Sequence, residues 1–124
     1  MVRFIYGENR YLASQTLKKI ESEFAARDPS NINVDKVEGA DLTVSKFVQV
    51  VSAMPFLADS RLVVIKNLML ENGNSDIKST IAEKLPLIDS KALELVFVET
   101  GEPDKRSKLY KYLLKEAKCT HCEE

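Results

Sequence analysis

The sequence predicts one α/β domain with a mainly parallel β-sheet and helices on both faces. Short apolar runs alternate with helical repeats along the chain, and the runs at residues 62–65 and 93–98 are apolar throughout. Continuously apolar strands are typical of a parallel sheet covered on both sides. Strands that alternate with helices are typical of right-handed crossovers. Since 124 residues suffice for a single core, residues 1–124 are assigned to one domain.

The first predicted strand covers residues 3–6, where strand-forming residues precede Gly7. A helix follows from Asn9 onward and is complete before Pro29. Its apolar residues recur at helical spacing along one face, with charged residues around them (Ala13, Leu17, Ile20, Phe24). This pattern predicts an amphipathic helix that packs against the sheet.

A second strand is predicted over residues 32–37, where β-branched residues precede the turn-forming Gly39. Asp41 and Thr43 are both good N-cap candidates for the helix that follows, which should stop before Pro55. The apolar face of this helix is predicted from its spacing (Val44, Phe47, Val48, Val51, Met54).

The two continuously apolar runs, residues 62–65 and 93–98, are the third and fourth predicted strands. Between them, the polar stretch 71–76 is expected to be a loop, and a third helix should end near Pro86. The core face of that helix is apolar (Ile77, Ile81, Leu85).

A fourth helix is predicted after the loop at residues 100–106. Its core face is apolar (Leu109, Tyr112, Leu113), and its basic residues should be solvated (Lys105, Arg106, Lys108, Lys111). Residues 119–124 begin either a fifth strand or a link to a further segment.

The composition is that of an ordinary globular protein, with 44% hydrophobic and 30% charged residues. The net charge of −1 gives no general indication of a nucleic-acid or anionic-membrane partner. We find no signal peptide and no apolar run of membrane-spanning length, so a cytoplasmic location is expected. Cys119, His121 and Cys122 offer three ligands where a structural zinc site needs four, so no metal or cofactor is predicted.

The turn between the first strand and first helix is where folds of this type bind phosphate. Aligned with G-x-x-x-x-G-K-[ST], Gly7 matches the first glycine and Ser14 the hydroxyl residue. Leu12 replaces the second glycine, and Ala13 replaces the lysine that contacts the β- and γ-phosphates. The sequence therefore predicts a degenerate phosphate loop, formed by these four residues, that does not support nucleotide hydrolysis.

The end of the third strand supports the same conclusion. An ATPase of this layout carries acidic residues there that hold magnesium and polarise water, but Lys66 and Asn67 occupy the position. A small nucleotide-dependent enzyme with an atypical phosphate loop remains the alternative interpretation. A metal-binding fragment that uses Cys119, His121 and Cys122 is a third one.

Phe56 and Leu57 follow the second helix in the segment PFLADSR. An isolated apolar pair of this kind more often fills a core beneath a turn than contacts a partner, because loop tips are usually polar. Arg61 is either a charge at the strand end or the partner of a carboxylate.

The segments FIYGENRYL, SAMPFLADSRLVVIKN and LVFVETGEPDKRSKLYKYL together resemble the N-terminal domain of the delta subunits of bacterial DNA polymerase III clamp loaders. The resemblance covers essentially the whole chain. It implies a P-loop NTPase or AAA+-like three-layer domain that does not bind nucleotide, in agreement with the residues at positions 12, 13, 66 and 67. The chain itself is then not an enzyme, although it is a component of a DNA polymerase holoenzyme.

The resemblance also implies a site and its partners. Delta subunits insert two adjacent hydrophobic residues into the sliding clamp, or beta subunit, and favour its open form. The corresponding residues are Phe56 and Leu57, and Met54 and Pro55 belong to the same clamp-binding segment. Lid and collar domains, absent from this chain, contact the gamma/tau and delta prime subunits in the full-length protein. Contact with DNA is expected to be only indirect.

Overall fold

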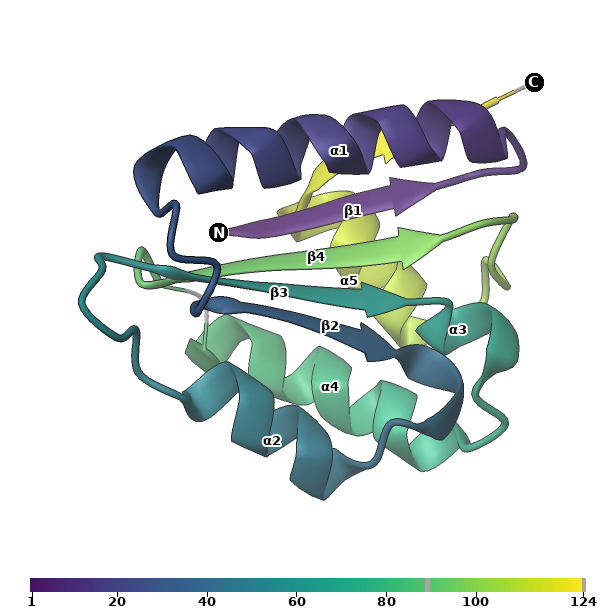
Figure 1. The fold of residues 1–124 in the computed structure, drawn as a ribbon. Helices are drawn as coiled ribbons and strands as arrows, with labels where there is room; N and C mark the ends of the chain where they lie inside the picture. Colours follow the sequence, from purple (N-terminus) through teal and green to yellow (C-terminus); the bar gives the residue numbers. More distant parts are fainter. Residues whose placement is uncertain (89, 124) are drawn as a thin grey trace.

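The computed structural model describes residues 1–88 and 90–123 as a β-sheet between two layers of helices (Figure 1). The five strands of the sheet are β1 (Val2–Tyr6), β2 (Val34–Glu38), β3 (Arg61–Lys66), β4 (Leu93–Glu99) and β5 (Lys118–His121). They lie in the order β2-β3-β4-β1-β5, and all neighbouring strands are parallel. The predicted fold class is confirmed.

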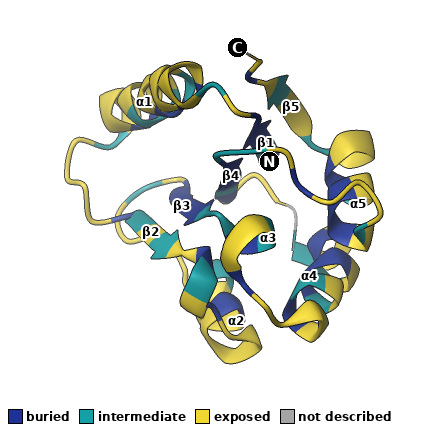
Figure 2. Cartoon of the chain, turned by 90° about the vertical axis from the view of Figure 1, so that its right-hand side faces the viewer, coloured by how far each residue is buried: buried dark blue, intermediate teal, exposed yellow. Residues whose placement is uncertain are grey.

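The helices cover both faces of this sheet unequally. They are α1 (Arg10–Arg27), the 3-10 turn η1 (Gly39–Asp41), α2 (Val44–Ser52), α3 (Leu68–Glu71), α4 (Ser75–Ile88) and α5 (Lys108–Glu116). The long helix α1 covers one face, and α2, α4 and α5 cover the other, as Figure 2 shows from the carboxyl ends of the strands. Within the described residues, no helix is long and apolar enough to cross a membrane.

Alternation along the central strands divides the core into two clusters. In β3, Val63 and Ile65 pack with α2, α4 and α5, whereas Leu62 and Val64 pack with α1. All four side chains are fully buried. Because both faces are covered, the strand has no polar face, which explains the continuous apolar run in the sequence.

Side-chain caps position the starts of the long helices. The Asn9 Oδ1 accepts from the Leu12 N–H at 3.0 Å at the start of α1, and the Thr43 hydroxyl accepts from the Lys46 N–H at 3.1 Å at the start of α2. Of the two caps predicted for α2, Thr43 is therefore the one used, and Asp41 lies in η1.

Two boundaries in the first half of the chain differ from the prediction. The second strand begins at Val34 rather than at residue 32, because residues 28–33 form a turn in which Ile32 is 61% exposed. Helix α2 ends at Ser52, so Met54 lies outside it and is exposed. Its core face is centred on Phe47 and the unpredicted Val50, whereas Val44 and Val48 are partly exposed.

The second half contains further differences. The loop predicted over residues 71–76 is limited to residues 72–74, because Glu71 ends the unpredicted helix α3 and Ser75 begins α4. Helix α4 passes through Pro86 to Ile88. A proline so close to the end of a helix removes only one late hydrogen bond, so the helix does not break there.

The fourth predicted helix begins at Lys108, so Lys105 and Arg106 precede it. Tyr110 joins Leu109 and Leu113 in its buried face, and Tyr112 is only partly buried. Residues 118–121 form the edge strand β5 beside β1, as the first of the two interpretations of the C-terminal segment expected.

Candidate functional site

The most exposed cluster of large apolar side chains lies in the loop between α2 and β3. Met54 is 81% exposed, Phe56 58% and Leu57 91%, and Pro55 between them is half-buried. The loop lies at the amino ends of the strands, at the left of Figure 1. All four residues of the predicted clamp-binding segment therefore lie in this loop, and neither Phe56 nor Leu57 fills the core.

The backbone of Phe56 is fixed by Asn33, a side chain that is only 1% exposed. The Phe56 N–H donates to the Asn33 Oδ1 at 2.7 Å, and the Asn33 Nδ2 donates to the Phe56 carbonyl at 2.9 Å. The side-chain amide of Asn33 thus makes the same two hydrogen bonds to Phe56 that a residue of a neighbouring β-strand would make. It holds the loop against the sheet at the residue that carries the exposed aromatic ring.

A small polar network supports Asn33 in turn. Its Nδ2 also donates to the Asp28 Oδ2 at 2.8 Å, and the Ser30 hydroxyl donates to the Asp28 Oδ1 at 2.6 Å. Hydrogen bonds from Ser30 and then Asn33 hold the pKa of the Asp28 carboxyl below its usual value. The carboxylate at the end of α1 is therefore charged at neutral pH and keeps the amide of Asn33 oriented.

Leu57 adopts a left-handed backbone conformation, with φ of 53°. For a residue with a side chain this conformation costs free energy unless its surroundings hold it. The pairing at Phe56 fixes the preceding residue, and the buried Ser60 and Arg61 fix the end of the loop. Arg61 forms an ion pair with Asp35. Of the two interpretations that the sequence allowed for Arg61, the partner of a carboxylate is therefore the correct one.

The turn from β1 into α1 has only three residues, Gly7 to Asn9. Helix α1 begins at Arg10, so Leu12, Ala13 and Ser14 all lie within its first turns. Of the four residues of the predicted phosphate loop, Gly7 therefore lies in the turn and the other three lie on the helix. Ala13 is 2% exposed and packs in the core beneath α1.

The backbone groups of this turn are used within the chain. The Gly7 N–H donates to the Gly101 carbonyl at 2.9 Å, and the Asn9 N–H donates to the Cys122 carbonyl at 3.0 Å. Gly7 has φ of 128°, and a Cβ atom there would lie 2.2 Å from the Cys122 carbonyl oxygen. The segment after β5 therefore occupies the space beside the turn.

The carboxyl ends of β3 and β4 carry a polar cluster that sequence reasoning missed. The Asn67 Oδ1 accepts from the Thr100 N–H at 2.8 Å. The fully buried Glu99 accepts from the backbone N–H groups of Met69 and Leu70 in α3 at 3.1 and 3.0 Å. Burial raises the pKa of Glu99 to about 7, although the hydrogen bonds oppose that shift. No spacing in the sequence distinguishes this glutamate from a surface residue.

Glu99 is expected to make stability depend on pH. The pKa of Glu99 is about 7 in the folded chain and 4.5 for an ordinary glutamate, so between these two pH values the folded state binds more protons than the unfolded state. The free energy of unfolding therefore falls as the pH rises from the lower value to the higher one. From about pH 5 to pH 7.5 the free energy of unfolding should fall by about 2 kcal/mol. Urea unfolding at several pH values measures this change.

The matched variants for that experiment are Glu99→Gln, which removes the titrating group, and Glu116→Gln at an exposed position. The fall in stability should be much smaller in Glu99→Gln and unchanged in Glu116→Gln. An equal fall in wild type and Glu99→Gln would assign the pH dependence to other groups.

The C-terminal cysteine and histidine side chains do not converge. Cys119 is exposed and Cys122 is buried, and His121 lies between the carboxylates of Glu102 and Glu123 at 2.8 and 3.1 Å. Across residues 1–88 and 90–123, no group of three or more potential metal-ligating side chains is placed to hold an ion.

Comparison with known proteins gives a consistent result. The model of the family described as "DNA polymerase III, delta subunit" matches residues 4–123. The chain is 26% identical over 119 residues to DNA polymerase III subunit delta of Bacillus subtilis. That alignment covers 91% of this chain but 34% of the relative, so the chain spans about a third of the relative's length.

Two solved structures share the fold. The Bacillus subtilis DNA clamp loader delta protein superimposes with a TM-score of 0.73 at 21% identity, over 99% of this chain and 38% of that one. A DNA polymerase III gamma subunit-related protein of Thermotoga maritima superimposes with a TM-score of 0.69 at 10% identity, over 98% and 40% of the two chains. At 21% and 10% identity, the similarity to these two structures shows a shared fold and nothing further.

Proposed function

This chain belongs to the DNA polymerase III delta subunit family, a family of clamp loader proteins in DNA replication, and from that premise we propose that it binds the sliding clamp. The observation that carries the proposal is the exposure of Phe56 and Leu57 on a loop that partly buried hydrogen bonds from Asn33 hold in place. An aromatic and an aliphatic side chain on a fixed loop suit a hydrophobic pocket of a partner, with little ordering cost on binding. Met54 and Pro55 extend the same contact surface.

The proposed action on the clamp is a shift of its conformational equilibrium. If the loop binds the open form of the ring more tightly than the closed form, the open form becomes more populated by that difference in affinity. No covalent step is required of this chain. Sibling subunits then supply the ATP hydrolysis that the loading cycle uses.

We further propose that the chain does not bind ATP, and that it contributes to the polymerase holoenzyme without an activity of its own. Three features support this: the three-residue turn, the burial of Ala13, and the hydrogen bonds that already use the N–H groups of Gly7 and Asn9. A phosphate loop needs free N–H groups and a lysine at this place.

Titration of the chain with fluorescent ATP tests the nucleotide proposal. We expect no saturable binding at micromolar concentrations, with or without Mg²⁺. The N–H groups of Gly7 and Asn9 are already hydrogen-bonded within the chain, and Ala13 supplies no charge for a phosphate group. A clamp loader ATPase subunit serves as the positive control. Micromolar binding competed by unlabelled ATP would favour the alternative, a nucleotide-dependent enzyme.

Membership of the family supports the remaining proposals. We propose that residues 1–124 form one domain of a longer delta subunit, whose lid and collar domains contact the gamma/tau and delta prime subunits. In that arrangement the clamp-binding loop acts in the cytoplasm, where the clamp encircles DNA.

A further inference from the structure

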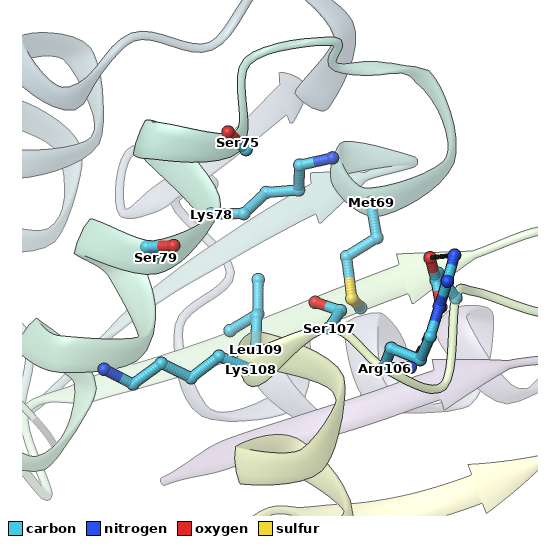
Figure 3. Close-up of a pocket in the computed structure, with 9 residues that line it drawn as sticks. Met69, Ser75, Lys78, Ser79, Arg106, Ser107, Lys108 and Leu109 are labelled. Atoms are coloured by element: carbon cyan, nitrogen blue, oxygen red, sulfur yellow. Dashed lines mark hydrogen bonds and ion pairs between the residues drawn. The ribbon is translucent and has the colours of Figure 1, made fainter.

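A cavity of about 430 Å³ lies between α3, α4 and α5, away from the clamp-binding loop. Figure 3 shows the side chains that line it. Six of them are cationic or carry hydroxyl groups (Lys78, Arg106, Lys108, Ser75, Ser79, Ser107). The cavity opens where α4 and α5 begin, near the carboxyl ends of the strands, whereas the loop of Phe56 lies at their amino ends.

The charge of this cavity is positive although the whole chain has a net charge of −1. Of the lining residues, Asp104 is the one acid against three cations. Arg106 donates to both oxygens of Asp104 at 3.1 Å, and these bonds hold the pKa of the carboxyl low. Because the charges of Asp104 and Arg106 neutralise each other, the excess positive charge of the cavity comes from Lys78 and Lys108.

The two lysines differ in how they are held. Lys108 lies 3.5 Å from the carboxylate of Glu83, outside the lining. Lys78 is half-buried on α4 and makes no ion pair within 4.0 Å of any residue in 1–88 or 90–123. Its charge acts on Asp104 from a longer distance and helps to lower the pKa of that carboxyl, after the hydrogen bonds from Arg106. Because no carboxylate is in direct contact with the Lys78 ammonium group and Asp104 is already paired with Arg106, Lys78 is available to an anionic ligand.

Hydroxyl groups and helix ends add donors from other directions. Ser75 is the first residue of α4, and Ser107 is the N-cap of α5. Ser79 lies one turn after Ser75 on the same side of α4. The N-terminal turns of both helices carry partial positive charge. Donors on two helices and on the loop before α5 thus line one cavity from different sides, which suits a tetrahedral oxyanion better than the two oxygens of a carboxylate.

We propose that this cavity binds a phosphate group. The group comes either from the backbone of a nucleic-acid strand or from a free phosphate compound. Lys78 supplies the main charge, and Ser75, Ser79 and Ser107 donate hydrogen bonds. The site is independent of the proposed clamp contact, because no residue that lines it belongs to residues 53–60.

Two probes test the proposal on the same protein. Sodium phosphate, titrated against sodium chloride at equal ionic strength, should shift the amide resonances of residues 75–79 and 107–110 in a saturable way. A fluorescein-labelled single-stranded oligodeoxynucleotide is followed by anisotropy. Oligonucleotide binding that phosphate competes away assigns the site to a strand backbone, and a response to phosphate alone assigns it to a free phosphate compound.

Charge reversal at matched positions provides the control. Lys78→Glu should weaken the binding of whichever probe binds by about tenfold or more, since it removes a charge-assisted contact and adds repulsion. Lys84→Glu makes the same change on α4 outside the cavity and should change affinity less than about twofold. Lys78→Ala, with no added repulsion, should give an intermediate loss.

The proposal is overturned if neither probe gives localised shifts or binding, or if Lys84→Glu weakens binding as much as Lys78→Glu. Circular dichroism of each variant checks that it is folded. Binding of phosphate should persist in a Phe56→Ala, Leu57→Ala variant, so failure here and failure of the clamp proposal are distinguishable.

Discussion

The double substitution Phe56→Ala, Leu57→Ala is expected to weaken binding of the chain to the sliding clamp by more than about 2 kcal/mol, or about thirtyfold. Both side chains are largely exposed in the free chain, so their truncation removes contacts with the partner and leaves the core intact. Surface plasmon resonance with immobilised clamp measures the loss. Most of it should be in the dissociation rate, as is usual for anchor residues.

The matched control for this variant is Val44→Ala, Val48→Ala on α2. These two side chains are 36% and 38% exposed and lie outside the loop, so their truncation removes apolar surface without touching the anchors. We expect clamp affinity to change less than about threefold. If the Phe56, Leu57 variant is folded and binds the clamp like wild type, the assignment of these residues as anchors is wrong.

Asn33→Ala is expected to reduce the free energy of unfolding by about 3 kcal/mol. The substitution removes both hydrogen bonds to the backbone of Phe56 and the one to Asp28, and it leaves a space in a site that is 1% exposed. Urea unfolding measures the change. Because the loop loses its support, clamp affinity should also fall by about fivefold or more at temperatures where the variant is folded.

Asn31→Gly is the control for that variant. Asn31 lies in the same turn, and its φ of 60° suits glycine, so the substitution changes the turn without touching Phe56. We expect wild-type clamp affinity. Asn33→Ala with reduced stability but unchanged affinity would show that Asn33 supports the fold alone and has no role in positioning the anchors.

The sequence predicted the central elements well because their patterns are long. The apolar stripe from Ala13 to Phe24 repeats over several helical turns. The runs that form β3 and β4 are apolar at successive positions, which indicates strands buried on both faces. Short elements were harder to predict. The four residues of α3 are too few to show a period, and the turn before β2 is stabilised by side-chain hydrogen bonds that apolar spacing does not reveal.

The candidate site was predicted only in part for a related reason. Phe56 and Leu57 were proposed as anchors by family resemblance, since an apolar pair in a loop is by itself more often buried, and the structure shows that both are exposed. Asn33 could not be identified, because its contact with Phe56 joins residues 23 positions apart and exists only in the folded chain. The raised pKa of Glu99 likewise depends on burial that no local pattern indicates.

The three-residue turn between β1 and α1 limits what a substitution at Ala13 can do. Replacing Ala13 by lysine would place an ammonium group inside the core beneath α1 and would not recreate a phosphate site. The first turn of α1 would also have to unwind, and the segment at Cys122 would have to leave its place beside Gly7. A phosphate site at this turn would therefore require several coordinated changes in α1 and in the C-terminal segment, which no single substitution supplies.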